Sequence, residues 1–222
     1  MIVAIDGPSG AGKSTLAKGI AKELGFTYLD TGAMYRALAL KVLRERLDWA
    51  DEEKVGALVA TTNIDLVEHD GKMEVLLDGV NVSGLIRTPE VSQMASKVSA
   101  LKVVRQRLLE LQRRAAERGS VVAEGRDIGT VVFPQADVKV YIDASVEERA
   151  RRRFKELQLA GREVTLRETL CEIEERDKRD SERDLAPLRK AEDALAIDSS
   201  SLSADAVRER VMIEIRKKKI RK

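Results

Sequence analysis

Residues 2–24 read IVAIDGPSGAGKSTLAKGIAKEL: an apolar run, a glycine-rich turn and a helical repeat in direct succession. The run from Ile2 to Ile5 is continuously apolar and rich in β-branched residues, which is typical of a strand buried on both faces of a parallel sheet. From Lys13 onward apolar residues recur at helical spacing, and Gly25 follows where a helix C′ glycine belongs. The stretch therefore predicts strand, loop and helix in that order, the opening of an α/β fold.

The turn in this stretch matches the pattern G-x-x-x-x-G-K-[ST], which requires a strand before it and a helix after it. Its glycines let consecutive backbone N–H groups face phosphate oxygens, and the helix N-terminus adds its positive dipole end. Lys13 would supply charge to the β- and γ-phosphates of a nucleoside triphosphate, and the Ser14 hydroxyl would hold Mg²⁺. The alternative is a glycine turn that merely joins strand to helix. We predict a loop that binds a nucleoside triphosphate, ATP if the protein is a kinase, made of Gly7, Pro8, Ser9, Gly10, Ala11, Gly12, Lys13, Ser14 and Thr15.

The chain up to residue 83 predicts a second strand, a helix and a small meander. The strand spans residues 26–29, and Thr31 is placed to cap a helix from about residue 33 to residue 47. Residues 63–83 alternate apolar and polar positions, which favours an antiparallel arrangement with tight turns. The predicted turns are Asp70-Gly71 and Asp78-Gly79.

The remainder of the chain predicts further helices and a return to the core sheet. Pro89 opens helical periodicity that suits two helices closing at Gly119. Core strands are expected at residues 121–123, 138–142 and 194–197, and Ser203 is placed to cap a final helix.

The segment from Ser145 to about Arg183 is dense in charge and poor in large apolar residues. Two capping boxes, Ser145 with Glu148 and Thr165 with Glu168, predict two helices here. Few apolar anchors predict a mobile segment. Phosphoryl transfer needs cations around a charge-rich transition state and needs water excluded, so this arginine-rich segment favours a kinase.

Composition excludes several classes of protein. The 222 residues are 43% hydrophobic and 35% charged, which excludes a disordered chain, and no apolar run reaches the about 20 residues of a membrane span. The net charge of +2 gives no general affinity for nucleic acid, and the basic run from Lys217 lacks stacking aromatics. Cys171 and His69 are the single residues of their types, too few for an intramolecular disulfide or a structural zinc site. Without a signal sequence the expected compartment is the cytoplasm.

Five stretches together resemble the bacterial cytidylate kinases, nucleoside monophosphate kinases that phosphorylate CMP and dCMP. Residues 5–14 open as that family does, and residues 125–134, GRDIGTVVFP, are nearly diagnostic of it. The other stretches are 30–36, 95–98 with Arg105, and 176–183. The resemblance covers nearly the whole chain, and the meander corresponds to the insert that distinguishes the bacterial type from shorter relatives.

The resemblance implies an α/β fold with a P-loop kinase core, in which helices flank a parallel sheet. The core would comprise residues 1–30, 84–145 and 184–222. An acceptor-binding domain with the antiparallel β-meander insert would span residues 31–83, its helices continuing to about 105. A short helical lid would span residues 146–183. The implied enzyme is a cytoplasmic monomer that uses ATP, CMP or dCMP and Mg²⁺, with no nucleic-acid or membrane partner.

The same resemblance implies roles for individual residues. The acceptor phosphate would be held by Thr31, Arg36, Arg126 and Arg183. Cytosine would be read by Ser96, Arg105 and Asp127, the sugar hydroxyls by Arg176 and Asp180, and Tyr35 would line the site. Catalytic charge would come from Lys13, Arg126, Arg183 and the lid residues Arg149 and Arg153, while Glu124 would reach Mg²⁺ through water. Cytosine presents a donor amine where uracil does not, so hydroxyl or carboxylate acceptors such as Ser96 and Asp127 suit it.

Several alternatives remain open at this point. A switch GTPase is disfavoured because the chain has no N-K-x-D motif. A kinase for another monophosphate or small metabolite, and an ATP-dependent nucleic-acid-binding factor, share the phosphate loop. Asp143 could be a metal-binding acid or a turn residue, and Arg149 and Arg153 could be ligands or solvated partners. Solvated i,i+4 pairing is the expectation for Glu147, Glu148, Arg151 and Arg152.

Overall fold

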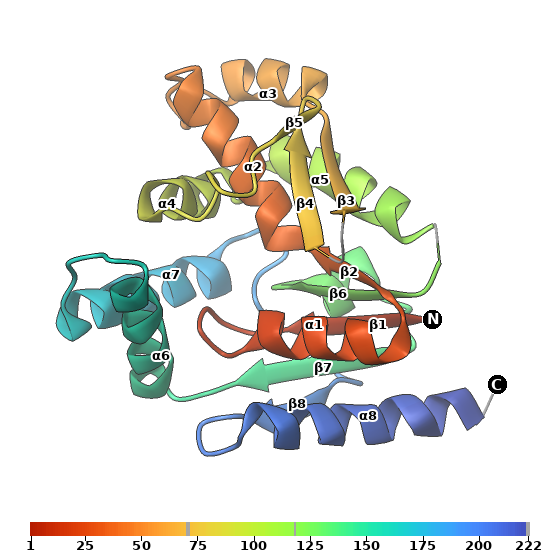
Figure 1. Cartoon of the computed structure of the whole chain (residues 1–222). Helices are drawn as coiled ribbons and strands as arrows, with labels where there is room; N and C mark the ends of the chain where they lie inside the picture. Colours follow the sequence, from red (N-terminus) through yellow and green to blue (C-terminus); the bar gives the residue numbers. More distant parts are fainter. Residues whose placement is uncertain (70–71, 118, 221–222) are drawn as a thin grey trace. The chain divides into compact units, whose positions relative to one another are not determined.

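The computed structural model describes residues 1–69, 72–117 and 119–220. Contacts divide the chain into two compact units (Figure 1), one made of Met1–Thr27 with Ser120–Lys222 and the other of Tyr28–Gly119. The predicted turn Asp70-Gly71 lies outside the described residues. Within the described part of the chain, no helix is long and apolar enough to cross a membrane.

Among the described residues, a five-stranded sheet supplies the core of the first unit, except that one of its edge strands, residues 27–30, falls almost wholly in the residue range of the second unit. Its order is β2-β6-β1-β7-β8, with β1 paired in parallel to β6 and β7, and β7 paired in parallel to β8. The strands are β1 (Ile2–Asp6), β2 (Thr27–Asp30), β6 (Val121–Gly125), β7 (Val138–Asp143) and β8 (Leu195–Asp198). Central positions such as Val3, Ile5 and Val122 are fully buried, as continuous apolar strands in a parallel sheet should be. The α/β fold class predicted from the sequence is confirmed.

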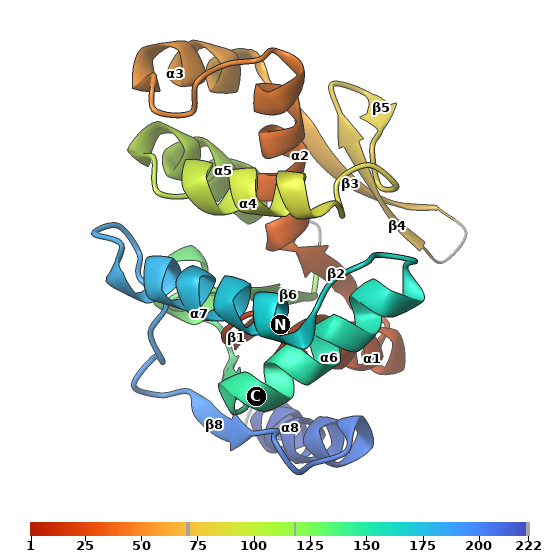
Figure 2. The ribbon, with the colours of Figure 1, turned by 90° about the vertical axis from the view of Figure 1, so that its left-hand side faces the viewer.

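Helices complete this unit. They are α1 (Lys13–Leu24), α6 (Val146–Leu159), α7 (Leu166–Glu182) and α8 (Ala204–Ile220), with a short π-helical turn, η1 (Ile128–Val132), after β6. Figure 2 shows α6 and α7 packed against each other. Thr165 and Glu168 form the predicted reciprocal capping box. At Ser145 only half of the predicted box forms, because the Glu148 carboxylate instead accepts from Arg152.

In its described residues, the second unit combines four helices with a three-stranded antiparallel sheet. Its elements are α2 (Thr31–Arg44), α3 (Glu52–Thr61), β3 (Ile64–His69), β4 (Lys72–Leu77), β5 (Val80–Asn81), α4 (Pro89–Val98) and α5 (Lys102–Ala116). The meander and the pair of helices after Pro89 are confirmed. Within this unit α4 contacts α2, and α5 contacts α3.

Two further local details differ from what the sequence led us to expect. Thr31 was expected to cap a helix starting near Ala33, but the helix begins at Thr31 and its cap is Asp30, whose side chain accepts from the Ala33 N–H. The helix α3 was not predicted from the sequence, although Asp51 caps it. Only Val55 and Val59 are buried on α3, and so short an apolar stripe gives a weak helical pattern.

Candidate functional site

The glycine-rich loop between β1 and α1 is shaped by close backbone contacts. At Gly7, a Cβ atom would lie 1.9 Å from the carbonyl oxygen of Ile142, so only glycine fits. Gly12 precedes α1 with φ of 95°, in the left-handed region that favours glycine. Ser14 and Thr15 are exposed on the first turn of α1. The predicted strand, loop and helix are thus confirmed, with the hydroxyls accessible to a ligand.

Lys13 lies buried at the start of α1 and folds back onto the loop. Its Nζ donates to the carbonyl oxygen of Pro8 at 2.6 Å. Burial, followed by repulsion from Arg126, lowers the Lys13 pKa to about 7. An ammonium group in such surroundings gains from a polyanion, because phosphate oxygens would replace a neutral carbonyl as its partner.

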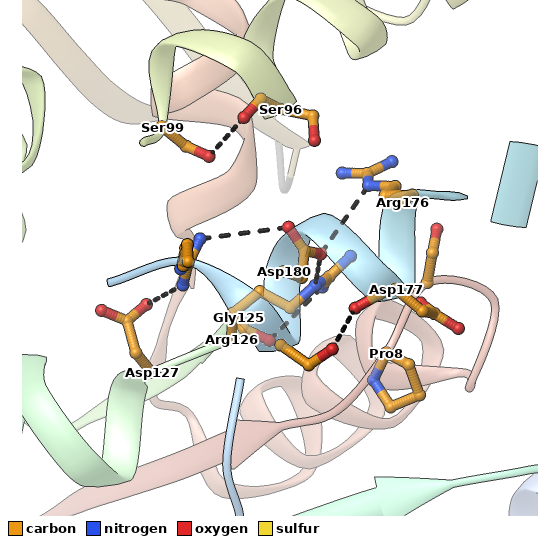
Figure 3. Close-up of polar contacts among 12 residues, drawn as sticks. Pro8, Ser96, Ser99, Gly125, Arg126, Asp127, Arg176, Asp177 and Asp180 are labelled. Carbon is orange, nitrogen blue, oxygen red and sulfur yellow. Dashed lines mark hydrogen bonds and ion pairs between the residues drawn. The ribbon is translucent and has the colours of Figure 1, made fainter. Parts of the chain in front are cut away.

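A network of arginines and acids lies in the same unit. Figure 3 shows Arg126 and Arg176 directed toward Asp180. The Arg126 Nε donates to Asp180 at 2.8 Å, and Arg176 and Arg183 nitrogens lie 4.0 and 3.9 Å from that carboxylate. Burial alone would raise the Asp180 pKa, but the Arg126 and Arg176 charges outweigh it and hold the pKa below its ordinary value. Arg183 also lies 3.7 Å from Asp127. The structure therefore brings these five predicted residues together.

The two predicted lid arginines lie in different surroundings. Arg149 is buried and donates to the carbonyl oxygens of Ser9 in the loop, at 3.2 Å, and of Ala144, at 2.9 Å. It also pairs with Asp177 of α7. Arg153, one turn further along α6, pairs with Glu156 in a partly exposed i,i+3 contact. Of the two arginines, the described contacts therefore bring only Arg149 to the phosphate-binding loop.

The second unit carries the other predicted ligands. The Arg105 guanidinium lies 5.8 Å from the centre of the Tyr35 ring and donates to the Ser99 carbonyl oxygen at 3.1 Å. Ser96 is buried, and its hydroxyl oxygen has no hydrogen-bond partner among the described residues. A buried hydroxyl without a partner is costly unless a ligand completes its hydrogen bonding.

Thr31 and Arg36 lie at the beginning of α2 in this unit. Thr31 is buried in the first turn, and Arg36 donates to Asp30 at 3.0 Å. Arg87 also reaches Asp30, at 3.4 Å, so two guanidinium groups share one carboxylate. Sequence reasoning assigned no role to Asp30 or Arg87, although Asp30 is itself a preferred capping residue and directly precedes the observed helix α2.

A cavity of about 220 Å³ adjoins the loop within the first unit. Its lining includes Gly12 and Thr15 of the loop, Ile142 of β7, and Leu202 and Val207 toward α8. Arg152 and Ser199 also line it, and the Arg152 guanidinium donates to the Ser199 carbonyl oxygen at 2.7 Å. Sequence reasoning missed this cavity because its walls come from four separate parts of the chain. For Arg152, the predicted i,i+4 pair with Glu148 does form.

Metal ligation would depend on few protein groups. No cluster of three or more His, Cys, Asp or Glu side chains suited to a metal occurs among the described residues. Glu124 is a buried carboxylate at the end of β6, and Ser14 offers an exposed hydroxyl. Hard oxygen donors, few in number, fit Mg²⁺, which usually keeps waters and takes further ligands from substrate phosphates. The Asp143 carboxylate accepts from the N–H of the adjacent Ala144, a local bond that is typical of a turn residue.

Comparison with known proteins gives consistent matches over most of the chain. Residues 3–217 match the family described as cytidylate kinase. The cytidylate kinase of Carboxydothermus hydrogenoformans is 51% identical over 93% of both chains. That of Syntrophotalea carbinolica is 51% identical over 96% of this chain and 90% of its own. A crystal structure of an uncharacterized protein from Eubacterium ventriosum is similar in fold, with a TM-score of 0.52 at 13% identity over 97% and 98% of the two chains.

Proposed function

The chain belongs to the cytidylate kinase family, and we propose that it transfers the γ-phosphoryl group of ATP to CMP or dCMP, giving ADP and CDP or dCDP. The observation that carries this proposal is the arrangement of Lys13 and the arginine network in one unit. Lys13 is buried in the phosphate-binding loop close enough to Arg126 for the two charges to repel, and Arg126 is in turn paired with Asp180.

In the proposed reaction a phosphate oxygen of CMP attacks the γ-phosphorus of ATP in line, and the bond to the β–γ bridging oxygen breaks as ADP leaves. Negative charge spreads over the equatorial oxygens in the transition state. Lys13, Arg126 and Arg183 would stabilise that charge without forming a covalent intermediate. The attacking oxygen is already anionic near neutral pH, so no residue needs to act as a general base.

Mg²⁺ would be held by the Ser14 hydroxyl and, through water, by Glu124. When bound, this ion supplies charge neutralisation to the β- and γ-phosphates of ATP. The buried position of Glu124 beside the charge of Lys13 supports the assignment, because that carboxylate acts on the lysine's pKa.

The loop, residues 7–15, would bind the triphosphate, and the adjoining cavity suits the nucleoside of ATP. Its apolar side chains could cover a base, and the Ser199 hydroxyl accepts from Arg152 at 3.1 Å within its wall. Residues 146–183 would act as the lid that excludes water. The bond from Arg149 to the Ser9 carbonyl oxygen supports a role at the loop, whereas Arg153 would have to leave Glu156 to reach a phosphate.

Cytosine recognition would depend on Ser96, Arg105 and Asp127. The Ser96 hydroxyl has no partner within the described part of the chain, and this supports the role because the hydroxyl can accept from the cytosine amine. A site built around such groups rejects a base that leaves them unpaired. The remaining proposed ligands are Thr31, Tyr35 and Arg36 in the second unit, and Arg126, Arg176, Asp180 and Arg183 in the first.

A coupled assay of ADP release with ATP and Mg²⁺ tests the proposal. AMP, GMP, UMP, TMP, CMP and dCMP are compared with a reaction that has no acceptor. Activity confined to CMP and dCMP is the expected result. Preference for another monophosphate would contradict the assignment of Ser96, Arg105 and Asp127. Turnover that needs no acceptor, or that RNA or DNA stimulates, would instead support an ATPase.

A further inference from the structure

Asp6 is the last residue of β1 and directly precedes the phosphate-binding loop. Its side chain is 4% exposed and makes two long-range hydrogen bonds to backbone. Its two carboxylate oxygens accept from the N–H groups of Ile128 and Gly129, each at 2.7 Å. These are the first N–H groups of η1, which have no partner within the helical turn itself. One carboxylate therefore caps a turn that lies 122 residues further along the chain.

The same turn is closed by its own backbone hydrogen bonds. The Asp127 carbonyl oxygen accepts from Val131 at 2.8 Å and from Val132 at 3.1 Å. A Cβ atom on Gly129 would lie 3.3 Å from a carboxylate oxygen of Asp6 and 3.2 Å from the Lys139 side chain. The backbone at Gly129 and the Asp6 carboxylate thus pack closely, with little space for either to move.

Arg126 and Asp127 stand immediately before this anchored turn. Arg126 reaches Asp180, and Asp127 lies beside Arg183. Asp6 itself is joined by a peptide bond to Gly7, whose backbone packs on Ile142. We infer that Asp6 is a positioning residue that holds Arg126 and Asp127 in fixed register with the phosphate-binding loop. This inference rests on the proposed function, since its kinetic consequence is poorer use of CMP.

Burial raises the Asp6 pKa to about 6 despite the two N–H bonds that lower it. The group is therefore ionised at pH 7.5, where both oxygens accept. Replacement by asparagine keeps the size of the side chain but turns an NH₂ group toward one of the two N–H donors. Asp6→Asn consequently loses one of the two bonds.

The test compares Asp6→Asn with a matched control, Asp137→Asn, at pH 7.5. Asp137 accepts from the Ile2 N–H at 2.7 Å, so it makes the same kind of bond at the opposite end of β1. For Asp6→Asn we expect the KM for CMP to rise about tenfold and the ratio of kcat/KM for CMP over UMP to fall. The Kd for ATP measured without CMP should change less than about twofold, and amide hydrogen exchange at 128 and 129 should accelerate.

The inference is overturned if Asp6→Asn raises the KM for CMP no more than Asp137→Asn does, or if it weakens ATP binding equally. Gly129→Ala is a second variant, because its Cβ presses on the same carboxylate, and it should reproduce the CMP effect if Asp6→Asn does not fold. Should the wild-type protein not phosphorylate CMP, the proposed function fails. Amide hydrogen exchange then tests the positioning role of Asp6 independently of CMP phosphorylation. Unchanged exchange at residues 128 and 129 in Asp6→Asn would overturn that role.

Discussion

Replacing Asp180 by asparagine removes the negative charge to which Arg126 is paired. The Arg126 Nε and a carboxylate oxygen of Asp180 lie 2.8 Å apart. The Arg126 side chain is only 16% exposed and that of Asp180 only 7%. At an effective dielectric constant of about 20 the attraction is about 6 kcal/mol, and desolvation of the pair offsets several kcal/mol of it. Removing one partner of a buried pair typically costs about 3–5 kcal/mol. We expect the lower end, about 3 kcal/mol, because Asp177 and Glu124 also act on Arg126.

Urea unfolding at pH 7.5 measures this loss, with Asp193→Asn as the matched control. Asp193 pairs with Lys139 at 2.9 Å but is 66% exposed, so its pair should contribute less than about 1 kcal/mol. Because the pKa of Asp180 is lowered on folding, its stabilisation is present above the ordinary value of 3.8 and is lost as pH falls below it. The difference between wild type and Asp180→Asn should therefore shrink near pH 3. A loss no larger than that of Asp193→Asn at pH 7.5 would refute the reasoning from burial.

Three further predictions concern activity and binding. Lys13→Ala should lower kcat by about 10²–10³-fold, because it removes charge stabilisation at the migrating phosphoryl group, and a near-normal coupled-assay rate would contradict the loop's assigned role. Asp127→Ala should lower kcat/KM for CMP by about 10–100-fold and less for UMP, and equal losses would mean that Asp127 does not read the base. Because burial lowers the Lys13 pKa to about 7 and phosphate should raise it, ATP binding at pH 8 should be accompanied by proton uptake. Calorimetry would show this uptake as a binding heat that varies with the buffer's ionisation enthalpy. Lys13→Met should abolish that variation, and buffer-independent heat in the wild type would argue against the lowered pKa.

Local patterns in the sequence were sufficient for most of the architecture. Apolar periodicity, glycine spacing and capping residues act within a few positions of the chain, so they predicted the loop after β1, the meander and the helices that start at Pro89 and Thr165. The cap of α2 was misplaced by one residue because Asp30 and Thr31 are adjacent and both can cap a helix. The pattern supplied the roles of the phosphate-binding loop, whereas the family resemblance supplied the individual roles in acceptor binding.

Tertiary structure decided which of the chemically similar residues share an environment. Arg149 and Arg153 lie one turn apart on α6, yet only Arg149 contacts the loop and Asp177, because the position of α7 depends on packing far from either residue in sequence. The hydrogen bonds that Asp6 accepts from Ile128 and Gly129 join residues more than a hundred positions apart in the sequence. The cavity beside the loop is likewise lined by four separate segments of the chain. The sequence determined the local elements because backbone propensities and capping act over a few residues. Only the fold could pair distant charges, because burial and long-range hydrogen bonding depend on where separate elements meet.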